Sequence, residues 1–152
     1  MVLSNTGIMA SNTAIIKVGR LLEIRADAGY RTAQEVDVLF DTIEREVDKL
    51  PLTNKHVTVV DWRRCPIMAP EAAERIAARI AGVNDRTERS AAIASKDSAT
   101  AVLQFLRVIR DAKLPDRKLF FEESELSEWL AEVLTGFELR RLRDFLTEMR
   151  AA

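Results

Sequence analysis

Two periods of apolar and polar residues alternate along the chain, and each change of period predicts a boundary between a strand and a helix. In "NTAIIKVGRLLEIRADAG", at 12–29, apolar and polar residues alternate around Gly19 and Arg20, which predicts two strands joined by a short turn. The "HVTVVDW" segment at 56–62 is apolar and β-branched, which is typical of a strand buried in mid-sheet. Two short apolar runs, "RSAAIAS" and "RKLFF", predict the remaining strands of a five-stranded sheet.

The segments between these strands follow the 3.6-residue period of amphipathic helices. Thr32 followed three residues later by Glu35 is a capping box, so the first helix is expected to begin there and to end before Pro51. A second helix is expected at 70–81, between Pro70 and Gly82. The positions predicted to be buried in these two helices are Val36, Leu39, Phe40, Ile43, Val47 and Leu50, and Ala73, Ile76, Ala77 and Ile80.

Three further helices are expected in the second half of the chain. Asp97 or Ser98 is expected to cap the third helix and Ser124 the fourth, and the fifth follows Thr135 and Gly136. The positions predicted to be buried are Val102, Phe105, Leu106 and Ile109, then Leu126, Trp129, Leu130 and Val133, and last Leu142, Phe145, Leu146 and Met149.

This order of elements, ββαβαβαβαα, predicts the fold class. Strands that alternate with helices imply right-handed crossovers and a mostly parallel sheet, here mixed because the first hairpin adds an antiparallel strand. A chain of 152 residues is the size of one ordinary domain. We therefore expect an α/β domain at 14–134, preceded by a flexible segment at 1–13 and followed by an amphipathic helix at 135–152.

Composition narrows the classes of partner and chemistry. The chain has 23 Lys and Arg against 24 Asp and Glu, so its overall field favours neither nucleic acid nor an anionic membrane. Its apolar runs are too short for a membrane span, and we expect a cytoplasmic protein. Cys65 and His56 are the only cysteine and histidine, so we expect neither a disulfide framework nor a metal site, and no cofactor.

Four segments stand in a recognisable order: the early hairpin, "VVDWRRCPIMAPEAAERI", "AAIASKDSATAVLQFLRVI" and "LFFEESELSEWL". Their arrangement resembles the STAS domain, the fold of the anti-sigma factor antagonists, in its SpoIIAA-like branch, which is related to STAS/Sec14-like lipid carriers. The resemblance covers about residues 15–134. It implies a STAS-like sheet with helices packed on it, an extra C-terminal helix, and a bacterial protein that works by binding other proteins.

One corner departs from the family pattern. In anti-sigma factor antagonists the corner after the third strand carries a hydroxyl that a partner kinase phosphorylates. The matching positions here are Ala69, Pro70, Glu71 and Ala72, so no acceptor hydroxyl stands there. Glu71 in the first helical turn has two interpretations: a permanent substitute for the phosphorylated state, or an acid that only stabilises its helix through the helix dipole.

Cys65 at this corner and His56 before the central strand each have a functional and a structural interpretation. Cys65 beside Arg63 and Arg64 could be a redox-sensing thiol of lowered pKa, but a lone cysteine next to proline is more often packed in a core, and we favour that. His56 precedes the central strand with no nucleophile motif nearby, and it is expected to be a surface histidine.

No carboxylate pair with a nucleophile or base emerges, so we expect no enzyme. The first hypothesis is a regulatory protein-interaction module, whose binding residues are Arg63, Arg64, Pro66, Ile67, Met68, Glu71 and Arg75. The alternative is a carrier or sensor of a small apolar, lipid-like ligand, in a pocket lined by Phe40, Ile43, Ile76, Phe105 and Ile109. These five are also expected core residues.

The last helix must bury its apolar stripe against some surface. Packing on its own domain is the simplest solution, and exchange with a second copy to form a homodimer is the leading alternative. A role at a membrane surface would need a more basic polar face than Glu138, Asp144 and Glu148 allow.

Overall fold

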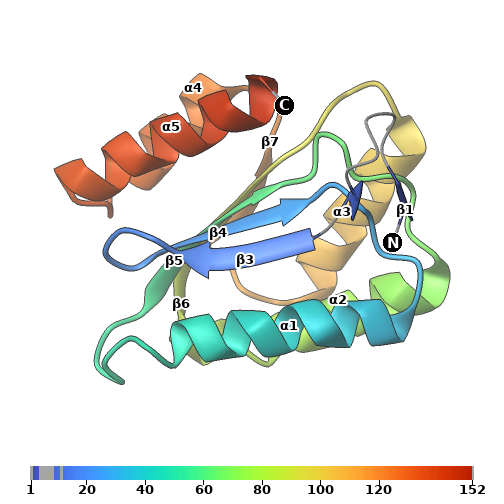
Figure 1. The fold of residues 1–152 in the computed structure, drawn as a ribbon, viewed down its shortest axis with the longest axis horizontal. Helices are drawn as coiled ribbons and strands as arrows, with labels where there is room; N and C mark the ends of the chain where they lie inside the picture. The colour runs from blue at the N-terminus through green and yellow to red at the C-terminus, as the bar shows by residue number, and fades with distance from the viewer. Residues whose placement is uncertain (1, 4–8, 11, 152) are drawn as a thin grey trace.

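A five-stranded mixed sheet forms the centre of the molecule (Figure 1), as the pattern predicts. The computed structural model describes residues 2–3, 9–10 and 12–151 and the side chains of residues 12–148. The sheet order is β3-β4-β5-β6-β7; β3 is antiparallel to β4, and the other neighbours are parallel. The strands are β3 (Asn12–Ile16), β4 (Leu21–Ala26), β5 (His56–Asp61), β6 (Thr87–Ile93) and β7 (Arg117–Phe120). A separate two-stranded pair joins β1 (Val2–Leu3) to β2 (Met9–Ala10).

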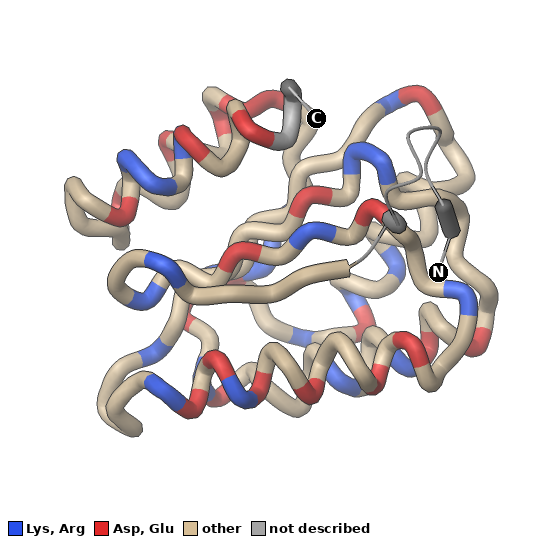
Figure 2. The backbone as a smooth tube through the Cα atoms, in the orientation of Figure 1, with Lys and Arg blue, Asp and Glu red and all other residues tan. Residues whose placement is uncertain are grey.

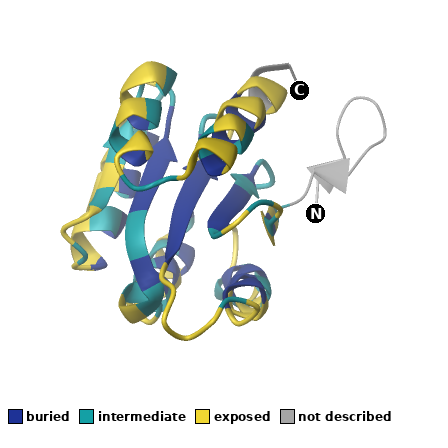
Figure 3. Ribbon diagram, turned by 90° about the vertical axis from the view of Figure 1, so that its left-hand side faces the viewer, coloured by how far each residue is buried: buried dark blue, intermediate teal, exposed yellow. Residues whose placement is uncertain are grey.

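Helices cover both faces of the sheet (Figure 3). The first face carries three helices and the second carries two, and Figure 1 shows α4 and α5 above the sheet with α1 and α2 below it. The helices are α1 (Ala33–Val47), α2 (Pro70–Ala81) and α3 (Ala99–Asp111) on the first face, α4 (Glu123–Ala131) and α5 (Gly136–Ala151) on the second, and a short 3-10 turn η1 (Asn84–Arg86). The predicted α/β class with a mostly parallel mixed sheet is confirmed, and the layout is consistent with a STAS-like architecture.

Strand β5 explains how two cores form around one sheet. All six of its residues are buried, and alternate side chains point to opposite faces. Val60 therefore belongs to the core under α1, α2 and α3, whereas Val57 and Val59 belong to the core under α4 and α5. A central parallel strand is buried along its whole length because helices cover both of its faces.

The helices α1 and α3 begin at polar caps. Thr32 accepts a hydrogen bond from the Glu35 backbone N–H, and Ser98 accepts one from that of Ala101, as the sequence predicts. The prediction for the fourth helix is wrong: Ser124 lies inside α4, whose N-cap position is Glu122. A single serine near a helix start did not fix the boundary, because the acidic residues around it suit the first turn equally well.

Two burial predictions are also wrong. Leu106 is 46% exposed, and Val108 is buried in its place, because α3 is rotated relative to the predicted stripe. His56 is not a surface residue: it is the first residue of β5 and is 1% exposed. The predicted flexible segment 1–13 falls partly on residues 1, 4–8 and 11, which lie outside the described residues.

Helix α5 packs on its own domain. Leu142, Phe145 and Leu146 are buried against the second face of the sheet, beside Leu126 and Leu130 of α4. The side chain of Met149, the fourth member of the predicted stripe, lies outside the described side chains. The stripe thus needs no second copy for its burial, and the homodimer stays a prediction.

Candidate functional site

The corner between β5 and α2 is held rigidly against the sheet and against the loop before α1. Trp62 donates its backbone N–H to the Ile93 carbonyl at 2.8 Å, and the Ala69 N–H reaches the Tyr30 carbonyl at 3.4 Å. The Trp62 ring stacks on Phe105 of α3, with 4.5 Å between ring centroids, and its indole N–H donates to the Tyr30 hydroxyl. The corner therefore has little freedom to change shape.

One side chain of helix α3, Gln104, is hydrogen-bonded to the corner backbone. The Gln104 amide accepts from the Met68 backbone N–H at 2.8 Å and donates to the Met68 carbonyl at 2.9 Å. Ile67 and Leu103, each next in sequence to a residue of this bridge, are 56% and 68% exposed. Leu106, one turn further along α3, is 46% exposed. We call Ile67, Leu103 and Leu106 the corner patch.

The predicted partner-binding residues separate into two groups. Arg64, Pro66, Ile67, Glu71 and Arg75 are exposed, as a binding role requires. Met68 is 2% exposed, since its side chain fills the core between the sheet and the helices, so it supports the corner from beneath and offers no surface. Arg75 is tied to Asp37 of α1 at 2.7 Å.

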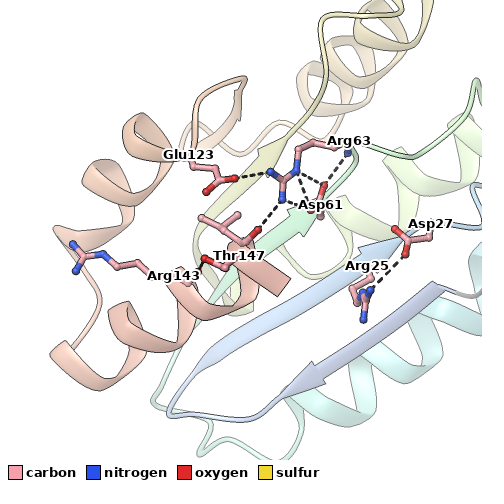
Figure 4. A network of polar contacts seen from close by, with 8 residues as sticks. Arg25, Asp27, Asp61, Arg63, Glu123, Arg143 and Thr147 are labelled. Atoms are coloured by element: carbon pink, nitrogen blue, oxygen red, sulfur yellow. Dashed lines mark hydrogen bonds and ion pairs between the residues drawn. The ribbon is translucent and has the colours of Figure 1, made fainter. Parts of the chain in front are cut away.

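Arg63 faces the other layer of the molecule (Figure 4). Its guanidinium bonds Asp61 at 2.7 Å and Glu123 at 2.7 Å, and it donates to the Leu146 carbonyl of α5 at 3.2 Å. The Asp61 side chain is 2% exposed, so this carboxylate depends on Arg63 for charge compensation. Arg63 therefore connects the corner to α4 and α5.

The geometry contradicts a reactive thiol at Cys65. The residue is buried, and burial together with the nearby Asp27 raises its pKa to about 12. Arg63 points away to Asp61 and Arg64 is exposed, so neither supplies the lowered pKa of a redox sensor. The core interpretation of Cys65 holds.

A cavity of about 40 Å³ lies between the first face of the sheet and the helices α1 and α2. Four of the five residues predicted for an apolar pocket line it: Phe40, Ile43, Ile76 and Ile109. Phe105, the fifth, is buried against Trp62, which lines the cavity. The volume matches a few water molecules, at roughly 10–15 Å³ each, and is far below the roughly 300–1,000 Å³ of drug-sized ligand sites.

Polar residues form one end of this cavity, and of these the sequence analysis considered only His56, which it expected at the surface. They come from the amino-terminal ends of three neighbouring strands: His56 and Thr58 from β5, Thr87 and Ser90 from β6, and Arg117 from β7. Burial lowers the pKa of His56 to about 4; the charges of Arg117, Arg86 and Arg20 act in the same direction, and a hydrogen bond with the Arg86 backbone acts against them. The signal was present in "HVTVV", where His56 and Thr58 share the parity of buried Val60 and so had to face the same core.

Comparison with known proteins leaves the family open. A scan of the chain against protein-family models gives no match, and neither does a search of curated proteins. The STAS-like resemblance accordingly stays a prediction. Among the residues that the structure describes, no group of three or more His, Cys, Asp or Glu side chains could hold a metal ion. No helix in the described part of the chain is long and apolar enough to cross a membrane.

Proposed function

We propose that this chain is a non-enzymatic, STAS-like interaction module that binds a protein partner through the corner patch. The observation that carries the proposal is the exposure of Ile67, Leu103 and Leu106 on two segments that Gln104 locks together. A rigid apolar surface loses little conformational entropy on binding, which favours affinity.

The charges around the patch suit a protein partner. Arg64 and Arg107 are exposed, and neither has an ion pair among the described residues, whereas Arg75 and Arg79 are tied to carboxylates of α1. Glu71 and Glu74 of α2 are likewise exposed acids outside the ion pairs of the described part of the chain. Apolar residues surrounded by both signs of charge are typical of interfaces between separately folded proteins. Figure 2 shows the two signs interspersed along the chain, which agrees with an overall field that favours neither nucleic acid nor anionic lipid.

The corner between β5 and α2 also bears on regulation by phosphorylation. Pro70 and Glu71 occupy the first turn of α2, and no hydroxyl stands at the positions that match the phosphorylated residue of the anti-sigma factor antagonists. We therefore propose constitutive binding without a phosphorylation switch at this corner. Replacement of Glu71 by Ser with partner binding unaltered would remove the idea that Glu71 stands for a phosphate.

Capture of partners from an extract of the protein's own cells tests the proposal. The double variant Ile67→Asp, Leu103→Asp is compared with Val38→Asp, which changes a 63%-exposed residue of α1. We expect the double variant to lose a partner that the wild type and Val38→Asp both retain, with unchanged circular dichroism in all three. Equal retention of every captured protein by the double variant would overturn the proposal.

The alternative function, a carrier or sensor of a lipid-like ligand, finds less support. Four residues of the predicted pocket do line a common cavity, but its volume of about 40 Å³ would require α1 and α2 to part before such a ligand could enter. The interaction module needs no such rearrangement. A homodimer through α5 and a cytoplasmic location are further proposals, and native mass spectrometry and cell fractionation test them.

A further inference from the structure

Two residues that line the polar end of the cavity each carry one buried polar atom without a hydrogen-bond partner in the described part of the chain. The His56 Nδ1 and Arg117 Nε atoms are buried, and no described side chain or backbone group bonds either of them. Both residues line the same cavity, and the charge of Arg117 acts on His56. An unpaired buried polar group costs roughly 1–3 kcal/mol, so two of them at one cavity call for an explanation.

The hydrogen bonds of Thr87 define the protonation of the histidine ring. The Thr87 hydroxyl donates its single hydrogen to the Val83 carbonyl at 2.8 Å. Its contact with His56 Nε2 at 3.3 Å must then be one in which the hydroxyl oxygen accepts, so Nε2 carries the proton. Because burial keeps the ring neutral, Nδ1 is left as a bare acceptor.

Arg117 presents the complementary group. One terminal nitrogen of its guanidinium donates to the Asn84 side chain at 2.8 Å, and no carboxylate of the described chain pairs with it. Burial lowers its pKa to about 10, and Nε–H remains a donor because arginine is protonated well below that value.

We propose that this end of the cavity is a binding site for one hydroxyl group, which accepts a hydrogen bond from Arg117 Nε and donates one to His56 Nδ1. Only a group that both accepts and donates satisfies both atoms, which excludes a bare alkyl chain and a fully ionised carboxylate. The apolar remainder of the wall, including Ile43 and Ile76, accommodates at most a short alkyl group on that hydroxyl. The chemical class is therefore water or a small aliphatic alcohol. The site is independent of the proposed protein-binding function.

Nuclear magnetic resonance of the intact chain tests this site, because His56 is its only histidine and gives a single imidazole signal. We expect nitrogen shifts of a neutral ring with the proton on Nε2. Ethanol is then titrated beside fluoroethane, which has nearly the same shape but no O–H. If an alcohol occupies the site, ethanol shifts the His56 nitrogens and the Ile43 and Ile76 methyl signals in a saturable manner and fluoroethane does not. If water occupies it, a long-lived water gives cross-relaxation to the His56 ring and ethanol has no effect.

Two variants keep the test independent of folding. Arg117→Met removes the donor, and Arg107→Met, at an exposed arginine of α3, removes the same charge elsewhere. We expect the ethanol or water signal at His56 to disappear in Arg117→Met and to persist in Arg107→Met. A proton on Nδ1, an equal response to fluoroethane and ethanol, or the absence of both the alcohol and the water signal in the wild type would overturn the proposal.

Discussion

The strands of the sheet hold their buried titratable side chains in opposite ways on the two faces. Under α4 and α5, the buried carboxylates of Glu23 and Asp61 are each bonded by an arginine, Arg141 and Arg63. Under α1 and α2, the buried His56 and the adjacent Arg117 each keep one polar atom that has no hydrogen-bond partner among the described residues. Saturated groups hold a structure together, whereas unsatisfied ones mark a place where a ligand would be stabilised. We infer that the α4/α5 layer is structural and that ligand and partner sites belong to the α1–α3 side.

The largest expected loss of stability comes from removing an arginine that pairs with a buried carboxylate under α4 and α5. The Arg141 guanidinium bonds Glu23, whose side chain is 3% exposed, and this contact raises the pKa of Arg141 above its ordinary value. Arg141→Met leaves Glu23 buried without compensation, and we expect a loss of roughly 3–5 kcal/mol in the free energy of unfolding. The matched control is Arg31→Met, which removes an exposed pair with Glu35 and should cost less than about 1 kcal/mol. Urea unfolding measures both, and equal losses would contradict the distinction between the two kinds of pair.

The second expected effect is a pH-dependent loss of stability caused by His56, which is buried under α1 and α2. The His56 pKa of about 4 lies below the ordinary 6.5, so the folded state disfavours the protonated ring. The corresponding stability is complete above pH 6.5 and is lost as pH falls towards 4, by roughly 3 kcal/mol in all. The groups that oppose protonation are Arg117 of β7, Arg86 of η1 and Arg20 of the first turn.

Urea unfolding between pH 7 and pH 4 measures this dependence. His56→Gln keeps a polar group near the Nε2 position but has no titrating ring, so its stability should fall less over the same range. If the unfolding free energies of the wild type and of His56→Gln fall in parallel with pH, His56 is not buried in its neutral form.

The sequence predicts the secondary structure of the two faces better than it predicts the candidate site. Period and capping gave all five strands of the main sheet and all five helices, and α2 has the predicted bounds of Pro70–Ala81. Local patterns suffice there because an alternating or helical stripe has one buried side whatever its partner is. The rotation of α3, which buries Val108 and exposes Leu106, depends on contacts with other elements and could not be predicted from its own stripe.

The candidate site was predictable only in part. The exposure of Ile67 and the apolar cavity wall follow from local pattern, and the sequence indicated both. The polar end depends on His56, Thr87 and Arg117 meeting across three strands, and single-residue arguments do not supply strand order or register. The different directions of Arg63 and Arg64 likewise depend on Asp61 and Glu123, which belong to two different elements.

A third, smaller loss of stability is expected at Glu138, in the α4/α5 layer. Glu138 of α5 is 3% exposed and accepts from the backbone N–H of Arg20 at 2.7 Å and from that of Thr135 at 2.9 Å. Glu138→Gln leaves one of these donors facing an amide N–H₂, and we expect a loss of roughly 1–3 kcal/mol in unfolding free energy. Glu128→Gln, at an exposed position of α4, is the control and should change stability by less than about 0.5 kcal/mol. A loss no larger than that of the control would show that Glu138 is not needed to hold α5.

The smallest effect involves no loss of stability. Burial raises the Cys65 pKa to about 12, so the native thiol should react with a disulfide reagent at least about 100-fold more slowly than the unfolded chain. The absorbance of the released thiolate measures the rate. Fast reaction in the native state would revive the redox interpretation of this cysteine.

Native mass spectrometry of the protein isolated gently from its own cells tests the central claim most directly. The wild type is compared with two variants. One is the double variant Ile67→Asp, Leu103→Asp, and the other is Phe137→Asp, which changes a 73%-exposed residue of α5. The account predicts a second polypeptide on the wild type and on Phe137→Asp that is absent from the double variant. Loss of that polypeptide from Phe137→Asp alone would place the binding surface on the α4/α5 side and contradict the assignment.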